Sequence, residues 1–296
     1  MLPVGAALPG QTIDSKGGNM ATARDGRIQA RGLNFHYVEW GAAHAPPVVC
    51  LHGITQTAHS WDEVADDLGR DHRVLCLDQR GHGDSDWASD GDYSRQTQAA
   101  DVAAISEALA LDRFVLMGMS MGGINSITFT ALHAQKVRAL VIVDVSPEIQ
   151  AKGVENIRNF IQQEDVLPSF DAFVERAHAF NPRRSLENIR SRLRHNLKQL
   201  PDGRWTWKYD PALRSPNRGF QASALTNLWD DVNRIRCPTL IIKGGESDIL
   251  SADSARKMQT AIPGSHLAEI PGAGHSVMGD NPAAFIKATR AFLSDR

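Results

Sequence analysis

Three polar residues of this 296-residue chain have the types and the order needed to make a hydroxyl group a nucleophile. Ser120 stands between Gly118 and Gly122, after an apolar run and before a stretch with helical spacing. This G-x-S-x-G pattern predicts a strained turn between a strand and a helix that exposes the serine hydroxyl. His275 can take the serine proton, and a carboxylate such as Asp248 can hold that histidine in the required tautomer. We therefore expect Ser120 to attack a carbonyl group.

More than one carboxylate could be the partner of His275. Asp248 is favoured, because it lies in the loop directly after the apolar run 239–243, where a carboxylate can hold the histidine in the required tautomer. His275 stands apart from the other histidines because it completes the chain order serine, aspartate, histidine. Glu246 lies two residues earlier in the same loop, and Asp144, near the end of the run 141–145, is the main competitor. Small residues around His275 leave its ring accessible to a substrate.

Two backbone N–H groups are candidates for binding the oxyanion of a tetrahedral intermediate. A tight turn at Gly53 would direct the N–H of Ile54 toward the serine, and the N–H of Met121 directly follows Ser120. The segment 78–85 alternates glycines with charged residues, which favours a loop held rigid by side-chain hydrogen bonds rather than a catalytic one. It lacks a phosphate-binding glycine pattern.

The elements that must position these residues alternate between strands and helices. Residues 28–40 predict an antiparallel edge hairpin, and short apolar runs predict buried strands at 47–51, 74–77, 114–117, 137–143, 239–242 and, more weakly, 266–270. Apolar residues recur at helical spacing in 61–68, 96–111, 124–134, 254–262 and 282–293. This alternation predicts an α/β fold with a mostly parallel eight-stranded sheet and helices on both faces.

The alternation stops between residues 146 and 227, where the pattern is helical, aromatic and basic. We expect an all-helical cap at 146–227, a core made of 23–145 and 228–296, and a loose segment at 1–22. Residues 151–218 hold thirteen Lys and Arg against eight Asp and Glu, among them Arg183, Arg184, Arg190, Arg192 and Arg194. A solvated face is the favoured interpretation, and attraction of an anionic substrate is the alternative. The cap aromatics either line a pocket or pack the cap: Phe160, Phe170, Phe173, Phe180, Trp205 and Trp207.

Composition narrows the classes of function. A net charge of −2 argues against a nucleic-acid binder, and the chain has no apolar run long enough to span a membrane. Cys50, Cys76 and Cys237 have no metal-binding spacing and are expected to be free thiols, which suits a cytoplasmic protein. We expect neither a cofactor nor a metal, and the oligomeric state cannot be inferred from the sequence.

Taken in order, the motifs around Gly53, the 78–85 loop, Ser120, Asp248 and His275 resemble those of the α/β-hydrolase superfamily. The resemblance covers the chain from about residue 26 to the C-terminus, apart from the insertion. It implies Ser120 as nucleophile, His275 as base, Asp248 as acid, and Ile54 and Met121 as oxyanion donors. It also implies that the 78–85 loop is structural and that the insertion is a substrate-shaping lid.

The leading hypothesis is therefore a serine hydrolase that cleaves a carboxylic ester of a small to medium substrate through an acyl-enzyme. Serine at position 120 argues against epoxide opening and halide displacement, for which family members use aspartate. Hydrolysis of a lactone, an amide or a carbon–carbon bond in a β-diketone stays open, because these reactions use the same serine and histidine. A ligand-sensing protein with slow turnover is the alternative from another class.

Overall fold

The centre of the molecule is a sheet of eight strands: β1 (Arg24–Ala30), β2 (Leu33–Trp40), β3 (Pro47–Leu51), β4 (Arg73–Leu77), β5 (Phe114–Met119), β6 (Val137–Val143), β10 (Thr239–Gly244) and β11 (His266–Ile270). The computed structural model describes residues 23–214 and 225–294. The strand order is β1-β2-β4-β3-β5-β6-β10-β11. β2 pairs antiparallel with β1 and β4, and the other neighbours are parallel. The predicted mostly parallel sheet is confirmed.

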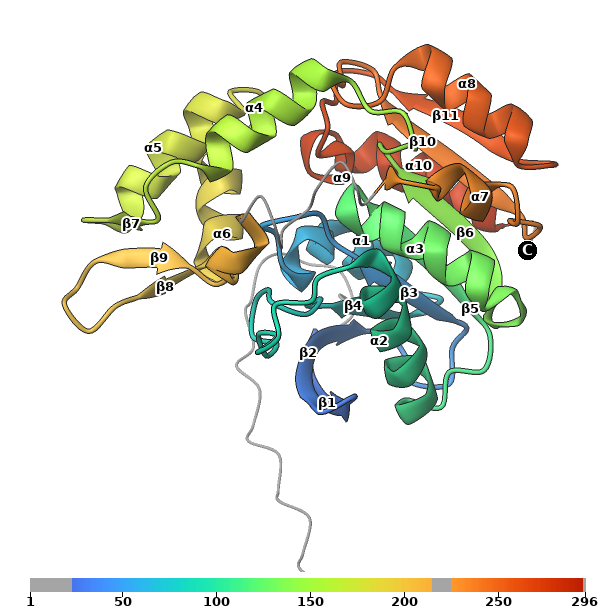
Figure 1. The fold of residues 1–296 in the computed structure, drawn as a ribbon, viewed down its shortest axis with the longest axis horizontal. Helices are drawn as coiled ribbons and strands as arrows, with labels where there is room; N and C mark the ends of the chain where they lie inside the picture. The colour runs from blue at the N-terminus through green and yellow to red at the C-terminus, as the bar shows by residue number, and fades with distance from the viewer. Residues whose placement is uncertain (1–22, 215–224, 295–296) are drawn as a thin grey trace, which may run out of the picture.

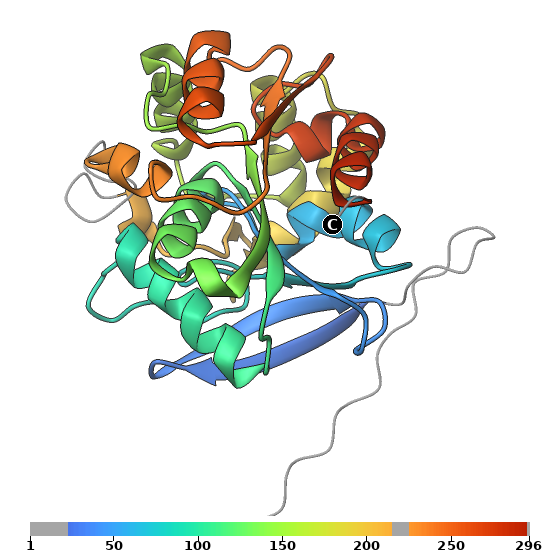
Figure 2. The same ribbon diagram turned by 90° about the vertical axis from the view of Figure 1, so that its right-hand side faces the viewer.

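Helices cover both faces of this sheet (Figures 1 and 2). One face packs against η1 (Ala58–Trp61), α1 (Asp62–Leu68), α9 (Val277–Asp280) and α10 (Pro282–Leu293). The other packs against α2 (Arg95–Ala108), α3 (Met121–Leu132), α7 (Leu228–Val232) and α8 (Ala252–Ala261). Along β3, Val48 and Cys50 belong to the first core and Val49 and Leu51 to the second. Strands that are buried on both faces consist of continuous apolar residues, so they could be recognised in the sequence.

The predicted helix boundaries agree to within a few residues. α10 spans 282–293 as expected, because Asn281 caps its N-terminus by accepting the Ala284 N–H and Pro282 occupies the first turn. α2 was expected to reach residue 111 but ends at Ala108. Ala110 has a φ of 52°, a left-handed conformation that stops a helix. Within the part of the chain that the structure describes, no helix is long and apolar enough to cross a membrane. The expected loose segment 1–22 lies outside the described residues.

The elements between β6 and α7 form a separate layer beside the sheet, which we call the cap (Figure 1). They are α4 (Ala151–Ile161), β7 (Val166–Leu167), α5 (Phe170–Phe180), α6 (Leu186–Asn196), β8 (Leu197–Gln199), β9 (Trp205–Trp207) and η3 (Pro211–Arg214). The prediction of an all-helical cap is wrong in one respect, because β7, β9 and β8 form a small antiparallel sheet. Strands of two or three residues are too short to show a periodic pattern.

Candidate active site

Ser120 joins β5 directly to α3 and has a φ of 53° and a ψ of −117°. Such a backbone conformation costs of order 1–3 kcal/mol in a residue with a side chain, and it persists only where the surroundings enforce it. A Cβ atom at Gly118 would lie 2.2 Å from the carbonyl oxygen of Gly122, and one at Gly122 would lie 2.3 Å from that of Leu51. Both glycines are therefore needed because β3, β5 and α3 meet backbone to backbone.

The side chains of Ser120, His275 and Asp144 form one hydrogen-bonded chain. His275 Nε2 lies 3.0 Å from Ser120 Oγ, and His275 Nδ1 lies 2.8 Å from Asp144 Oδ2. Asp144 directly follows β6, has a φ of 51° and is fully buried. Its carboxylate also accepts hydrogen bonds from the Gly244 N–H, at 2.8 Å, and from the Ser247 hydroxyl. Because an ionised carboxylate only accepts, Nδ1 carries the ring proton and Nε2 is left to accept the proton of Ser120.

The expectation that Asp248 is the partner of His275 is wrong. Its carboxylate accepts a hydrogen bond of 2.7 Å from the amide of Asn156 in α4. The loop after β10 carries Asp248 to the cap, where a Cβ at Gly153 would lie 2.3 Å from the Asp248 carbonyl oxygen. β6 lies between β5 and β10, so an aspartate at the end of β6 is nearer to Ser120 than one in the loop after β10.

The two residues expected to supply the oxyanion donors, Met121 and Ile54, lie near Ser120. Met121 is the first residue of α3, so its N–H belongs to the helix N-terminal donors that have no acceptor within the helix. Gly53 lies close to the nucleophile, since a Cβ placed on it would be 3.4 Å from the Cβ of Ser120. Ile54 follows Gly53 and lines the same cavity as Ser120. This placement is compatible with a two-donor oxyanion site.

The loop that carries Gly53 is fixed by buried polar side chains. His52 Nε2 accepts the N–H of Gln79 at 3.0 Å, and the Gln79 amide donates to the His52 carbonyl at 2.6 Å. Burial lowers the pKa of His52, so its ring is neutral and able to accept. His82 packs edge-on against His52 with ring centroids 4.9 Å apart. Its pKa falls to about 3, first because it is buried and then because His52 is beside it.

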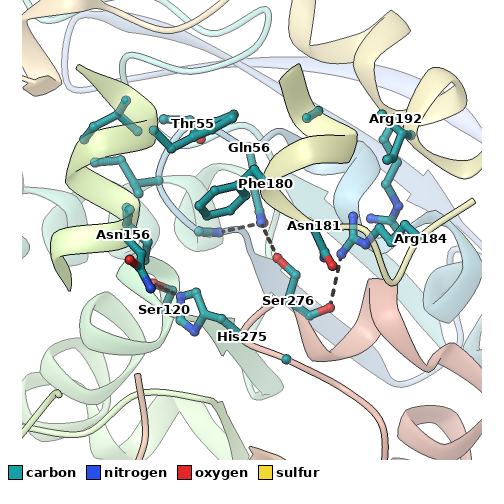
Figure 3. Close-up of a pocket in the computed structure, with 18 of the residues that line it drawn as sticks. Thr55, Gln56, Ser120, Asn156, Phe180, Asn181, Arg184, Arg192, His275 and Ser276 are labelled. Atoms are coloured by element: carbon teal, nitrogen blue, oxygen red, sulfur yellow. Dashed lines mark hydrogen bonds between the residues drawn. The ribbon is translucent and has the colours of Figure 1, made fainter. Parts of the chain in front are cut away.

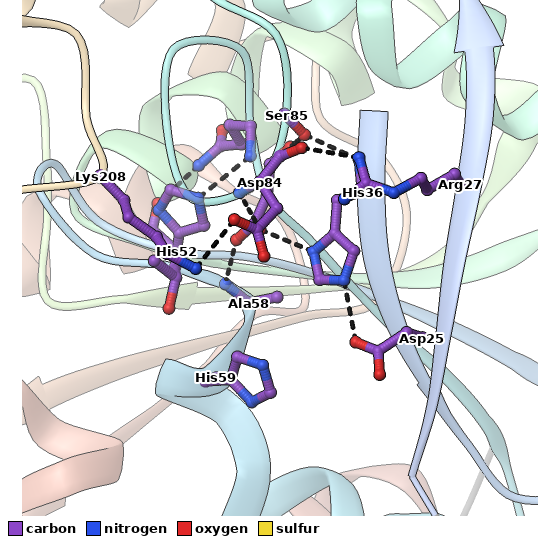
Figure 4. Close-up of polar contacts among 12 residues, drawn as sticks. Asp25, Arg27, His36, His52, Ala58, His59, Asp84, Ser85 and Lys208 are labelled. Carbon is purple, nitrogen blue, oxygen red and sulfur yellow. Dashed lines mark hydrogen bonds and ion pairs between the residues drawn. The ribbon is translucent and has the colours of Figure 1, made fainter. Parts of the chain in front are cut away.

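Asp78 anchors the neighbouring 78–85 loop through contacts with His36, Ala58 and Asp84, the three partners that Figure 4 labels. Its buried carboxylate accepts the N–H of Ala58 at 2.7 Å and that of Asp84 at 2.9 Å, and it lies 2.7 Å from His36 Nδ1. Burial alone would raise the pKa of Asp78, but the hydrogen bond from His36 and the electrostatic interactions with His52 and His36 outweigh it and lower the pKa to about 2. These contacts agree with the structural role expected for the loop.

A cavity of about 820 Å³ lies between the cap and the core, with Ser120 and His275 in its wall (Figure 3). Three cap aromatics line it: Phe160, Phe180 and Trp207. The other three aromatics singled out in the sequence, Phe170, Phe173 and Trp205, pack within the hydrophobic cluster of the cap. The cavity is large enough for a small to medium substrate, and its mixed apolar and polar wall is typical of ligand sites.

The arginines crowded in the cap sequence are mostly paired with carboxylates of the chain itself. Arg183 donates to Glu246 at 2.8 Å, and both side chains are partly exposed. Arg192 donates to the Ser60 carbonyl at 3.0 Å and to Glu63 at 3.3 Å. Arg190 pairs with Asp171 in the cap: Arg190 Nη1 lies 2.5 Å from Asp171 Oδ1.

Arg184 makes a contact that the sequence did not indicate. It donates to the buried carboxylate of Asp280 at 2.7 Å and to the Ser276 carbonyl at 3.2 Å. The second oxygen of Asp280 accepts the Gly274 N–H at 3.0 Å. Asp280 and Arg184 therefore hold the backbone on both sides of His275, so the cap helps to position the histidine. The partners are 96 residues apart, which is why no sequence motif revealed them.

Comparison with known proteins places this chain in a family. The family model described as an alpha/beta hydrolase fold matches residues 46–282. The chain is 32% identical to Esterase Rv0045c of Mycobacterium tuberculosis, over 98% of this chain and 96% of that protein. It is 31% identical to a 3-hydroxybutyrate-oligomer hydrolase of Cupriavidus necator, over 90% and 95% of the two chains.

Comparison with solved structures supports the same family. The crystal structure of Esterase Rv0045c matches with a TM-score of 0.77 at 31% identity and covers 92% of each chain. An α/β hydrolase from Novosphingobium aromaticivorans matches with a TM-score of 0.81 at 29% identity, covering 94% of this chain and 100% of that one. The chain belongs to the α/β-hydrolase family. Within it, the chain is an esterase-like hydrolase.

Proposed function

We propose that this protein hydrolyses a carboxylic ester through an acyl-enzyme formed on Ser120. The observation that carries the proposal is the hydrogen-bonded chain from Ser120 through His275 to the buried Asp144, which opens into the cavity below the cap. A serine hydroxyl is a weak nucleophile at neutral pH, and an adjacent oriented histidine is the usual means of activating it. Similarity to an esterase and to a 3-hydroxybutyrate-oligomer hydrolase supports a hydrolytic reaction of this kind.

Each residue has a defined part in the proposed reaction. Ser120 Oγ attacks the carbonyl carbon while His275 Nε2 takes its proton, and Asp144 stabilises the imidazolium that forms. The N–H groups of Ile54 and Met121 bind the oxyanion, a contribution of about 3 kcal/mol for each donor. The intermediate collapses as His275 returns the proton to the leaving alcohol. Water then attacks the acyl group with His275 again as the base.

Replacing Ser120 with alanine tests this proposal. We expect the variant to keep its circular dichroism spectrum and lose turnover of a simple aryl ester, because the nucleophile is gone and the fold does not depend on its hydroxyl. Undiminished turnover would refute the mechanism. A panel of esters, lactones and β-diketones on the wild type then identifies the preferred bond. A burst followed by very slow turnover would favour the ligand-sensing alternative.

We also propose that the ester carries a negative charge and that Arg176 binds it. Arg183 and Arg184, two of the five cap arginines noted in the sequence, are engaged by Glu246 and Asp280. Arg176 lines the cavity, and among the described residues it meets no carboxylate.

The contacts of Arg176 leave its charge available to a ligand. It donates to the Glu164 carbonyl and lies over the Phe173 ring, 5.4 Å from the centroid. We expect Arg176→Gln to lower kcat/KM for an anionic half-ester at least about tenfold, the scale of one lost charged hydrogen bond. The neutral ester of the same acyl group should be unaffected, and Arg190→Gln, a surface control outside the cavity, should change neither. Equal losses on both esters would contradict anion recognition.

Two further expectations stay proposals. Residues 146–227 act as the lid over the active site, which the cavity between cap and core supports. The protein acts in the cytoplasm, which the three free thiols support. Fractionation of the native cells with an antibody to the protein would test the second.

A further inference from the structure

Two histidines and an aspartate meet where the cap touches the core, and none of them lines the active-site cavity. His59 lies in η1, Asp62 begins α1, and His195 lies in the last turn of α6. One candidate ligand atom from each lies within 4.8 Å of the other two. We refer to these residues as the seam cluster. Figure 4 shows His59 next to Ala58, where η1 begins.

We propose that the seam cluster binds a divalent transition-metal ion of the Zn²⁺ type and thereby ties the cap to the core. Two imidazoles and one carboxylate are a donor set that Zn²⁺ accepts, with water in the fourth position. The three residues come from both sides of the seam, so an ion bound to all three would join α6 to η1 and α1.

The three side chains of the seam cluster lie close to, but not at, the positions they would take around a bound ion. The rings of His59 and His195 are stacked with centroids 3.5 Å apart, and His59 Nδ1 lies 3.1 Å from both oxygens of Asp62. Two atoms bound to one Zn²⁺ at about 2.1 Å can be at most about 4.2 Å apart. Binding therefore requires His195 to turn out of the stack and the three groups to draw together.

The cluster is open to an incoming cation. Lys208, whose charge acts on His195, is paired with Asp84 at 2.8 Å. The side chains of His59 and Asp62 are 20% and 41% exposed, so an ion can reach them from solvent.

An ion at the seam cluster would affect the contacts between α6 and the loop that carries Ile54. Asn196, the residue after His195, donates to the Thr55 carbonyl at 3.2 Å and accepts from the Thr57 hydroxyl at 3.2 Å. Thr55 directly follows Ile54, the proposed oxyanion donor. An ion at the seam cluster would therefore stiffen the joint between the cap and the loop that carries the oxyanion site.

Calorimetric titration of the untagged full chain with Zn²⁺ tests the proposal. We expect one ion per chain, and affinity at least about tenfold weaker in His195→Ala and in the near-isosteric Asp62→Asn, because each lacks one of three ligands. His44→Ala, an exposed histidine outside the cluster, is the matched control and should bind as the wild type does. Melting temperatures without metal establish that each variant is folded.

Amide hydrogen exchange gives an independent measure of the clamp. Zn²⁺ should slow exchange in α6 of the wild type and leave it unchanged in Asp62→Asn. The proposal is overturned if no saturable binding occurs, if either cluster variant keeps wild-type affinity, or if Zn²⁺ binds without slowing exchange in α6. Loss of binding in His275→Ala alone would place the ion at the active site and would also overturn it.

Discussion

Replacing Asp144 with asparagine tests which of the two candidate carboxylates, Asp144 or Asp248, is the partner of His275. In the native protein the Asp144 carboxylate accepts from the Gly244 N–H, the Ser247 hydroxyl and His275 Nδ1. An amide has a single acceptor oxygen, and its NH₂ group would face one of these donors. If it faces Nδ1, the ring proton moves to Nε2, which then cannot take the proton of Ser120.

The expected magnitude follows from this loss of the basic nitrogen. Fixing the wrong tautomer in such a triad lowers kcat about 10⁴-fold, which corresponds to roughly 5 kcal/mol of barrier at 1.36 kcal/mol for each factor of ten. The unmatched buried amide also costs about 1–3 kcal/mol of stability. Asp248→Asn should change kcat less than about fivefold, under 1 kcal/mol, because asparagine can still accept from Asn156.

The assay is the steady-state hydrolysis of one aryl ester by the wild type and both variants, with urea unfolding to confirm that each is folded. Measurement across pH shows whether the remaining activity of Asp144→Asn depends on hydroxide rather than on His275. The reasoning is refuted if Asp248→Asn loses three to four orders of magnitude while Asp144→Asn keeps most of its activity. Such a result would restore the assignment that the sequence favoured.

Three further predictions follow from the contacts. Gly122→Ala should lower kcat at least about 100-fold by displacing the turn at Ser120 by a fraction of an ångström or more, measured against an unchanged circular dichroism spectrum. Arg184→Gln should lower kcat about tenfold with little change in KM, because Asp280 then holds the histidine loop less firmly, whereas a rise in KM alone would contradict a positioning role. The folded pKa of Asp78 is about 2 against 3.8 in the unfolded chain, so its stabilisation, about 2 kcal/mol, is present above pH 4 to 5 and lost as the pH falls toward 2. Urea unfolding across this pH range should show that the free energy of unfolding falls less steeply with decreasing pH in Asp78→Asn than in the wild type. The same fall in both proteins would refute this assignment.

Much of the fold could be predicted because its strands are buried on both faces. Apolar runs such as 114–117 and 137–143 have no polar interruption, and the helix at 282–293 carries a capping asparagine and a proline at its start. Ser120 could be identified because the backbone packing around it excludes every side chain at Gly118 and Gly122. At these positions the local sequence and the tertiary packing favour the same conformation.

The carboxylate partner could not be chosen from the sequence, because the choice depends on loop conformation. Asp144 and Asp248 both follow parallel strands that are neighbours in the sheet, so spacing along the chain does not separate them. The left-handed backbone of Asp144 turns its carboxylate toward His275, while the close approach of α4 holds Asp248 at the cap. The Arg184–Asp280 pair and the short strands of the cap likewise depend on contacts between distant segments.

Covalent labelling tests the central claim most directly. An aryl phosphonate ester, which mimics the tetrahedral intermediate, should react with the protein once per chain and abolish ester hydrolysis in parallel. Peptide mass spectrometry should find the adduct on Ser120, and Ser120→Ala should remain unlabelled. Labelling at another residue, or full hydrolytic activity in the labelled protein, would contradict the account of Ser120 as an activated nucleophile.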